Sequence, residues 1–251
     1  MKIQYCSDLH LEFPLNKEFI ELNPIVPVGD ILILAGDIVP FENMDFAKDF
    51  FRFCSDNFKK TYWIAGNHEY YHAALDGRVS TFKEEIIKNV FLVNNYTIER
   101  EDLRIIFSTL WTKVSPEMAF FVQKGLNDYR IIRDGNSLFS VDRCNDLFEE
   151  NISYINSAVK NDNKHNIVVT HHVPTYQHYP SEYLKSKINE AFAVDLDHFI
   201  ETNSIHSWVF GHHHRNILPF KIGVTNMLTN QLGYMKYGEN KGFRVDAVIE
   251  V

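Results

Sequence analysis

The sequence has few cysteines, and they are poorly placed for cross-linking. The 251-residue chain contains three, Cys6, Cys54 and Cys144, which are odd in number and far apart. A disulfide framework or a zinc site built from paired thiolates would need closely spaced pairs. The cysteines therefore predict a reducing compartment, and we expect the protein to be cytoplasmic.

Basic residues are also scarce relative to acidic ones. Lys and Arg number 25 against 33 Asp and Glu, which gives a formal net charge of −8 at pH 7. A protein that holds long nucleic acid over a broad surface needs the opposite balance, because Lys and Arg neutralise the phosphates. A local basic patch is still compatible with this composition, so nucleic acid is an allowed but disfavoured partner.

Long apolar runs, repeats and linkers are missing from the sequence as well. No apolar stretch approaches the roughly 18 residues of a membrane helix, and the N-terminal MKIQYCSDLH turns polar too soon for a secretory signal. We find no internal repeat, low-complexity tract or Pro/Gly/Ser-rich linker. The sequence predicts no membrane partner and a single domain over residues 1–251, and it does not indicate an oligomeric state.

What the chain does contain is a series of short apolar runs of four to five residues, which are typical of central strands in a buried sheet. They lie at residues 2–6, 31–35, 61–65, 104–108, 166–170 and 207–210. Helical periodicity is present between them, at residues 44–58, 79–90 and 140–159. This alternation predicts an α/β fold with a largely parallel sheet and right-handed crossovers.

The final stretch of the chain differs from this alternation. Residues 221–228 and 242–251 read as two or more strands with no helix between them. Strands joined without a helix usually pair antiparallel. We therefore expect a second, more antiparallel sheet near the C-terminus.

Polar residues of metal-ligand type directly follow five of the apolar runs. They are Asp8 and His10 in SDLH, Asp37 in AGDI, Asn67 and His68 in AGNHE, His171 and His172 in THH, and His212 to His214 in GHHH. Ligands of open α/β sheets gather at the carboxyl ends of the strands. We therefore expect these five groups to meet in one crevice, although they span more than 200 residues of sequence.

Each of these groups has an ordinary structural explanation on its own. A D-x-H pair such as Asp8 and His10 occurs by chance, and Gly36-Asp37 is typical of a turn. Their joint occurrence at strand ends is harder to explain by packing, because burying uncompensated carboxylates and imidazoles costs several kcal/mol each. Bound cations remove that cost, so the pattern predicts a metal site.

These motifs resemble those of the calcineurin-like metallophosphoesterase superfamily, in which D-x-H, G-D, G-N-H-[DE], H and G-H-x-H follow in that order. The chain has DLH, GD, GNHE, His171 and GHHH, so the resemblance spans residues 8 to 214. It implies a four-layer α/β/β/α sandwich of two mixed sheets flanked by helices, with a dinuclear metal site at the strand carboxyl ends. Within the superfamily, the chain looks more like the compact bacterial and phage enzymes.

The resemblance also implies two divalent cations, which we expect to be manganese, iron, zinc, cobalt or nickel, with manganese favoured. Transferred position by position, it assigns the first cation to Asp8, His10, Asp37 and His214 and the second to Asp37, Asn67, His171 and His212. Asp37 would hold both, because its carboxylate has two oxygens. Mixed imidazole, carboxylate and amide ligands suit these metals better than a site of thiolates or of oxygens alone.

The adjacent histidines raise the question of which ones bind metal. In an extended segment residues i and i+2 point the same way, so we expect His212 and His214 to face the cations and His213 to point away. No such spacing separates His171 from His172. Family position favours His171 as the ligand, with His172 at the pocket rim or behind the ligands.

The resemblance gives His68 the catalytic role of general acid. Asn67 and His68 are both expected to contact the substrate phosphate, and a hydroxide bridging the metals would attack it while His68 protonates the leaving oxygen. Trp111 is expected either to wall the pocket or to belong to the core. Solvation is the more ordinary explanation for four basic residues that follow strand ends, Lys113, Arg130, Arg133 and Arg215.

Two departures from the family pattern bear on the substrate. Members that act on phosphoserine and phosphothreonine in proteins have D-R-G in the second motif and H-G-G in the fourth, whereas here Asp37 is followed by IVPFEN and the fourth motif is THHVP. We therefore expect a metal-dependent phosphoesterase for a small phosphodiester or phosphomonoester. A nuclease acting on DNA or RNA is the alternative, and a non-catalytic scaffold is disfavoured because the motif set is complete.

Overall fold

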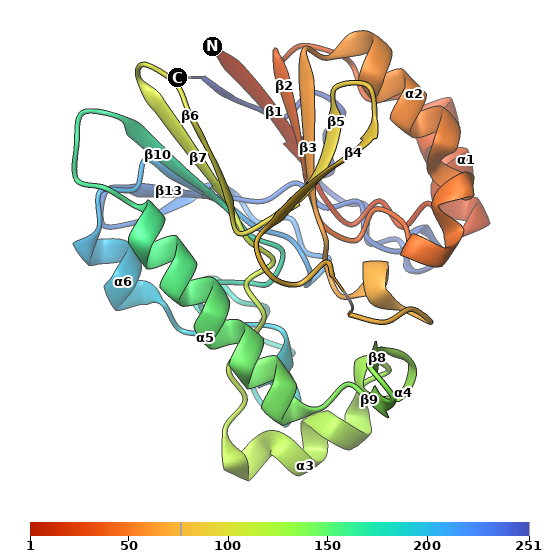
Figure 1. The fold of residues 1–251 in the computed structure, drawn as a ribbon, viewed down its shortest axis with the longest axis vertical. Helices are drawn as coiled ribbons and strands as arrows, with labels where there is room; N and C mark the ends of the chain where they lie inside the picture. Colours follow the sequence, from red (N-terminus) through yellow and green to blue (C-terminus); the bar gives the residue numbers. More distant parts are fainter. Residues whose placement is uncertain (76, 251) are drawn as a thin grey trace.

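Most strands of the chain form two six-stranded sheets in the computed structural model, which describes residues 1–75 and 77–250 (Figure 1). The first sheet has the strand order β14 (Val248–Glu250), β1 (Lys2–Cys6), β2 (Ile31–Ala35), β3 (Lys60–Ile64), β5 (Val90–Asn94) and β4 (Phe82–Ile87). The second has the order β12 (Phe220–Ile222), β13 (Thr225–Leu228), β11 (Ser207–Val209), β10 (His165–Val169), β7 (Leu103–Phe107) and β6 (Tyr96–Glu99). Each sheet has four parallel strands in its centre and one antiparallel strand at each edge.

Helices cover the outer faces of the two sheets (Figure 1). On the first sheet lie α1 (Pro14–Leu22) and α2 (Lys48–Asn57), the latter preceded by the 3₁₀ helix η1 (Phe41–Ala47). On the second sheet lie α5 (Val141–Ala158) and α6 (Asp197–Thr202). The remaining short elements are η2 (His68–Tyr70), α3 (Pro116–Gly125), α4 (Asp128–Ile131), β8 (Arg133–Asp134), β9 (Ser137–Leu138), η3 (Asn189–Ala191) and η4 (Met235–Tyr237).

The largest apolar interface lies between the two sheets. Alternate residues of each strand point into it, so that Tyr62 of β3 stacks on Phe107 of β7 with ring centroids 5.2 Å apart. The opposite faces of the same strands pack on the helices, as Trp63 does on Phe51 of α2. This arrangement confirms the predicted α/β fold and its four α/β/β/α layers.

The predicted helix at residues 79–90 is wrong, because this segment forms β4 and the start of β5. The two strands make an antiparallel hairpin whose turn includes Asn89 with φ of 59°. Exposure alternates along most of β4, with Phe82 half-buried and Lys83 exposed, as expected of an edge strand. Pairing of β5 with β3 decides the structure here over the helical spacing of the apolar residues.

The prediction of two sheets is correct, but the expected composition of the second is wrong. Its central strands β7, β10, β11 and β13 are all parallel, and only the edge strands β12 and β6 run antiparallel. The C-terminal β14 instead joins the first sheet beside β1. A connection without a helix can still place β13 parallel to β11, because β12 runs in the opposite direction between them in the sequence and β13 then reverses the chain again.

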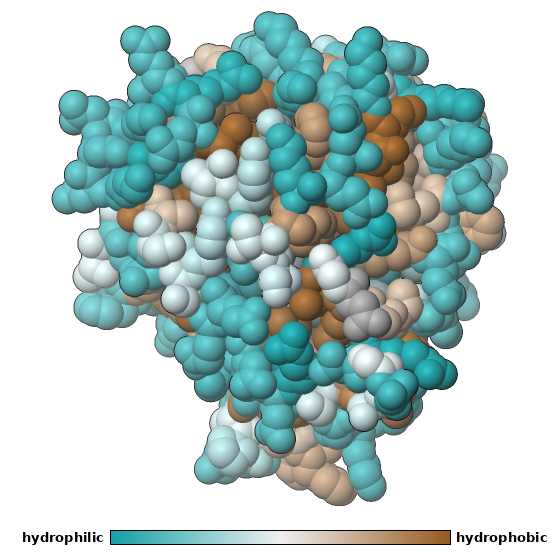
Figure 2. Space-filling view, viewed as in Figure 1, coloured by the Kyte–Doolittle hydropathy of each residue, from teal (hydrophilic) through white to brown (hydrophobic). Residues whose placement is uncertain are grey.

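The predicted helices at 44–58 and 140–159 are confirmed as η1 with α2 and as α5. α5 begins at a side-chain cap, in which Ser140 Oγ accepts a hydrogen bond from Arg143 N at 3.1 Å. On the face of the molecule in Figure 2, hydrophilic residues dominate and apolar residues appear in smaller areas between them. Over residues 1–75 and 77–250, no helix combines the length and apolarity that crossing a bilayer requires.

Candidate active site

The five polar groups predicted from the sequence meet where strands of the two sheets end. The groups after β1, β2 and β3 come from the first sheet, and those after β10 and β11 come from the second. Hydrogen bonds join them across the sheets, because His212 N donates to Asp8 Oδ1 at 3.0 Å and His171 Nδ1 lies 3.0 Å from the carbonyl oxygen of Ala35. The structure therefore places all of the predicted ligands in one cluster.

One half of the cluster contains Asp8, His10, Asp37 and His214, whose ligand atoms lie within 4.8 Å of one another. His10 Nε2 is 3.1 Å from His214 Nε2 and 3.7 Å from Asp37 Oδ2. His214 Nε2 is 3.4 Å from Asp8 Oδ1. These four side chains are the set that the sequence predicts for the first cation.

The other half contains Asp37, His171 and His212, again with ligand atoms within 4.8 Å of one another. His171 Nε2 is 3.4 Å from Asp37 Oδ1, 3.1 Å from His212 Nδ1 and 3.3 Å from Asn67 Oδ1. Asp37 thus turns Oδ2 towards the first half and Oδ1 towards the second. This is the geometry that a shared ligand of two cations needs.

The carboxylates of the cluster favour positive charge on two of its histidines, whereas burial lowers the pKa of the other two, His10 and His212. Burial opposes protonation of His171 and His214, but nearby carboxylates outweigh it. Asp37 raises the pKa of His171 to about 9, and Asp8 with Glu239 raises the pKa of His214 to about 10. With mixed nitrogen and oxygen donors facing a common centre, the residues present suit divalent transition metals.

The backbone at the cluster is unusual. Asp8, His10, Asp37, His212 and His214 all have φ between 47° and 77°, a region that residues other than glycine rarely adopt. Such residues concentrate at functional sites, where the surrounding structure holds them in place. His212 and His214 do meet in the cluster, but the extended backbone from which we predicted this is wrong, since a turn presents both side chains.

Hydrogen bonds from behind orient several of the predicted ligands. His214 Nδ1 is 2.7 Å from Glu239 Oε2, and His10 Nδ1 is 3.2 Å from Glu12 Oε1. Asn67 Nδ2 donates to Asp128 Oδ1 at 3.0 Å, which leaves its Oδ1 facing the cluster. Partners of this kind fix the ring or amide orientation of metal ligands.

His68 lies beside the cluster and both of its ring nitrogens have partners. Nδ1 is 3.4 Å from Glu12 Oε1, and Nε2 is 3.1 Å from the hydroxyl of Tyr234. Its ring stacks on Tyr71 with centroids 4.0 Å apart. Burial alone would lower the pKa of His68, but the carboxylates of Asp37 and Glu12 outweigh burial and raise it. When the His68 ring is protonated, Glu12 contacts its Nδ1–H, and its Nε2–H can donate a hydrogen bond to a ligand.

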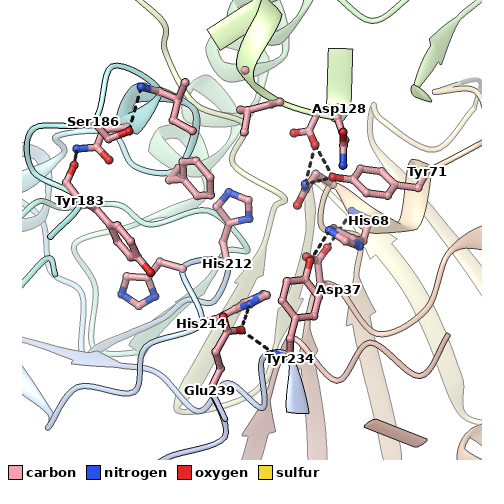
Figure 3. A pocket seen from close by; sticks show the side chains of 18 of the residues that line it. Asp37, His68, Tyr71, Asp128, Tyr183, Ser186, His212, His214, Tyr234 and Glu239 are labelled. Carbon is pink, nitrogen blue, oxygen red and sulfur yellow. Dashed lines mark hydrogen bonds and ion pairs between the residues drawn. The ribbon is translucent and has the colours of Figure 1, made fainter. Parts of the chain in front are cut away.

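A cavity of about 520 Å³ opens beside the cluster (Figure 3). Asp37, His68 and Asp128 line one side, whereas Tyr183 and Ser186 lie on the opposite side. Pockets for small organic ligands commonly measure about 300–1,000 Å³. The site therefore combines a cluster of metal-ligand side chains, a polarised histidine and room for a small molecule.

A family model described as calcineurin-like phosphoesterase matches residues 1–216. The chain belongs to this family. It is therefore a metallophosphoesterase, a metal-dependent hydrolase of phosphoric esters, and the resemblance inferred from the motifs is confirmed. The family depends on two metal ions, and the cluster around Asp37 is the candidate place for them.

The chain is also similar to two known proteins. The protein L509 of Acanthamoeba polyphaga mimivirus is 33% identical over 279 residues, a match that covers 99% of this chain and 96% of the relative. The crystal structure of phosphopantetheinyl hydrolase from Mycobacterium tuberculosis has a TM-score of 0.69 at 15% identity and covers 99% of this chain and 95% of that one. At such low identity, the second likeness supports the shared fold.

The acidic residue of the G-N-H-E motif has a structural part in this metallophosphoesterase. The Glu69 side chain is fully buried, and each of its oxygens accepts two hydrogen bonds. Oε1 accepts from Ile38 N at 2.7 Å and Trp63 Nε1 at 3.0 Å, and Oε2 from Asp37 N at 2.9 Å and Gly66 N at 2.7 Å. Burial and Asp37 raise the pKa of Glu69 to about 8, but four N–H donors fit the carboxylate and leave no place for a proton.

Replacing Glu69 with glutamine is expected to lower the free energy of unfolding by about 3 kcal/mol. The amide nitrogen would meet two N–H donors where the glutamate has an oxygen. Urea denaturation of the metal-free protein, followed by circular dichroism, measures the change. Glutamine at the exposed Glu101 is the control and should change stability by less than about 0.5 kcal/mol. Equal stabilities of the two variants would contradict this account of Glu69.

Four residues at the site escaped prediction, namely Glu12, Asp128, Tyr234 and Glu239. The sequence contains one indication of Glu12, because this residue continues the two-residue spacing of Asp8 and His10. Asp128 lies in the long connection between β7 and α5, outside the five motifs. Tyr234 and Glu239 follow the part of the chain that the family model matches. No spacing in the sequence links these last three residues to the motifs.

The side chains left open in the sequence can now be placed. His172 is buried with its ring centroid 4.3 Å from that of His212, so it packs behind a predicted ligand. His213 lines the cavity, but its Nδ1 contacts Gln231 Nε2 at 2.9 Å rather than the cluster. Trp111 is buried in the core beside Phe139. Lys113 pairs with Glu149, Arg215 pairs with Glu182, and Arg130 and Arg133 are exposed.

Proposed function

We propose that this metallophosphoesterase hydrolyses a small phosphate ester, with His68 as the general acid. The observation that carries the proposal is the sharing of Asp37 between two groups of ligand side chains beside a cavity that His68 also lines. We assign the first cation to Asp8, His10, Asp37 and His214 and the second to Asp37, Asn67, His171 and His212. When bound there, divalent cations lower the pKa of water and neutralise charge on a phosphate.

The protein's own residues have distinct parts in the proposed reaction. Asn67 contacts the substrate phosphate as well as a cation, and Asp128 holds its amide in the required orientation. His68 gives its Nε2 proton to the leaving oxygen. In the structure, the Tyr234 hydroxyl lies 3.1 Å from this nitrogen. Glu12 keeps the other ring proton and so sets the direction in which His68 points.

Small substrates are favoured over long nucleic acid on grounds of volume and charge. The cavity of about 520 Å³ suits a small molecule. The net charge of −8 opposes polyphosphate binding, which depends on Lys and Arg. Manganese is the metal that we propose. A reducing compartment such as the cytoplasm fits the three buried free cysteines. We treat residues 1–251 as one domain.

Removal and return of metal tests the proposed function. Protein freed of metal by a chelator is expected to hydrolyse neither bis-p-nitrophenyl phosphate nor p-nitrophenyl phosphate, and manganese should restore turnover of at least one of them. Release of p-nitrophenol measures both rates. A parallel assay with a DNA oligonucleotide at low and high salt covers the nuclease alternative, because phosphate contacts make binding strongly salt-dependent. Activity unaffected by the chelator, or cleavage confined to the oligonucleotide, would contradict the proposal.

A further inference from the structure

The cavity has two unlike sides, one polar and one largely apolar. Asp37 and His68, which follow β2 and β3 of the first sheet, lie on the polar side together with Asp128 from the connection after β7 (Figure 3). The facing side comes mainly from the connection between β10 and α6. We call Tyr179, Tyr183, Ile188 and Phe192 on this side the apolar wall. Phe192 brings the wall up to the ligands, because its ring centroid is 4.9 Å from that of His212.

The turn that carries the apolar wall is held by its own hydrogen bonds. The carbonyl oxygen of Tyr183 accepts from Ser186 N at 2.8 Å and from the Asn189 side-chain amide. Tyr183 N in turn donates to Pro180 O at 3.0 Å. The Tyr183 side chain keeps 38% of its surface exposed, so it can still stack against a ligand. The wall is a formed surface with a free aromatic face.

Apart from the proposed metal ligands and His68, the charged side chains that line the cavity are acidic. They are the carboxylates of Asp128 and Glu239, and the described lining contains neither lysine nor arginine that could hold a second negative charge of a ligand. A phosphomonoester has a second pKa of about 6 and is mostly a dianion at neutral pH. A phosphodiester carries a single negative charge. It also brings a second organic group, for which the apolar wall offers a place.

We propose that the cavity selects phosphodiesters over phosphomonoesters and that the second organic group lies against the apolar wall. This inference rests on the proposed function. In the reaction, the oxygen of water bonds to phosphorus, the bond from phosphorus to the leaving oxygen breaks, and that oxygen takes up a proton. The products are an alcohol and a phosphomonoester. The monoester fits the cavity less well than the substrate, so it leaves without a second hydrolysis.

Binding of two compounds that cannot be hydrolysed tests the selection directly. Diphenylphosphinate has one negative charge and two phenyl groups, whereas phenylphosphonate has one phenyl group and takes a second charge. Calorimetry on the manganese-loaded protein should show diphenylphosphinate binding about tenfold more tightly. Tyr183→Ala should weaken its binding about three- to tenfold, the range expected for one lost aromatic contact. Leu184→Ala is the matched control, because Leu184 is the next residue, is 55% exposed and does not line the cavity.

A second readout compares two diesters that share the p-nitrophenolate leaving group, phenyl p-nitrophenyl phosphate and methyl p-nitrophenyl phosphate. Tyr183→Ala should lower kcat/KM for the phenyl ester at least about threefold more than for the methyl ester. Equal losses for both esters, or phenylphosphonate binding as tightly as diphenylphosphinate, would overturn the inference. If no ester is hydrolysed but the binding preference depends on Tyr183, the proposed function fails and the apolar wall stands.

Discussion

Replacing Asp37 with asparagine is expected to lower phosphoesterase activity by more than about 10⁴-fold, the largest effect of any single substitution in the site. The carboxylate offers one oxygen to each half of the cluster, so its loss weakens both cation sites together. Without the cations, water keeps its pKa of about 15.7 instead of falling towards about 7, and the phosphate charge is not neutralised. Steady-state hydrolysis of bis-p-nitrophenyl phosphate measures the activity.

Metal content gives this prediction an independent readout. We expect the purified Asp37→Asn variant to hold at most one metal ion per chain after loading with manganese. Thermal unfolding shows whether the variant is folded, and Asp56→Asn on the exposed face of α2 is the control that should keep full activity. A folded Asp37→Asn variant with two metal ions or near-normal turnover would remove Asp37 from its assigned role.

Replacing His68 with alanine is expected to lower turnover by about 10²- to 10³-fold on a diester with an alkyl leaving group. The loss should be less than about tenfold when the leaving group is p-nitrophenolate, which departs readily without a proton. Among the described histidines that line the cavity, only His68 contacts both Glu12 and Tyr234. Its Nδ1 contacts the Glu12 carboxylate, and its Nε2 contacts the Tyr234 hydroxyl. Rates for a series of leaving groups measure the difference.

The metal ions should remain bound in the His68 variant, because this side chain is not among the proposed ligands. Elemental analysis of the variant separates loss of the acid from loss of metal. His198→Ala on the exposed face of α6 is the control and should leave both rates and metal content unchanged. Full activity of the His68 variant on the alkyl ester would mean that another group protonates the leaving oxygen.

Much of the metal cluster can be predicted from the sequence, because each residue follows an apolar run. Asp8, Asp37 and His171 stand within two residues of a strand end in the structure, as the pattern requires. The direction of the side chains could not be predicted in the same way. The positive φ angles at His212 and His214 could not be foreseen, since they depend on the turn after β11 and on contacts such as that of His214 N with Gln231 Oε1 at 2.7 Å.

The residues of the site that lie in connections between strands and helices could not be predicted from the sequence. Glu239 contacts His214, and Tyr234 contacts His68, across 25 and 166 residues of sequence. Neither residue belongs to a motif or follows a long strand. The apolar wall has the same origin, because its residues come from the connection between β10 and α6. Such long connections vary independently of the scaffold and commonly carry substrate contacts.

The fold could be predicted where periodicity had one interpretation. The runs at 2–6 and 31–35 match β1 and β2, since short and largely apolar runs of this length suit buried parallel strands. Residues 79–90 had two interpretations, because Phe82, Ile86 and Val90 fit a helical spacing as well as two short strands. Only the long-range pairing of β5 with β3 selects the strands. Local sequence does not contain that information.

Locating the metal ions is the most direct test of the account. Crystals of manganese-loaded protein, measured near the manganese absorption edge, should show two anomalous peaks per chain. We expect one peak among Asp8, His10 and His214 and one among Asn67, His171 and His212, with an oxygen of Asp37 contacting each. No peak, a single peak, or peaks that Asp37 does not touch would contradict the proposal that this carboxylate holds two cations.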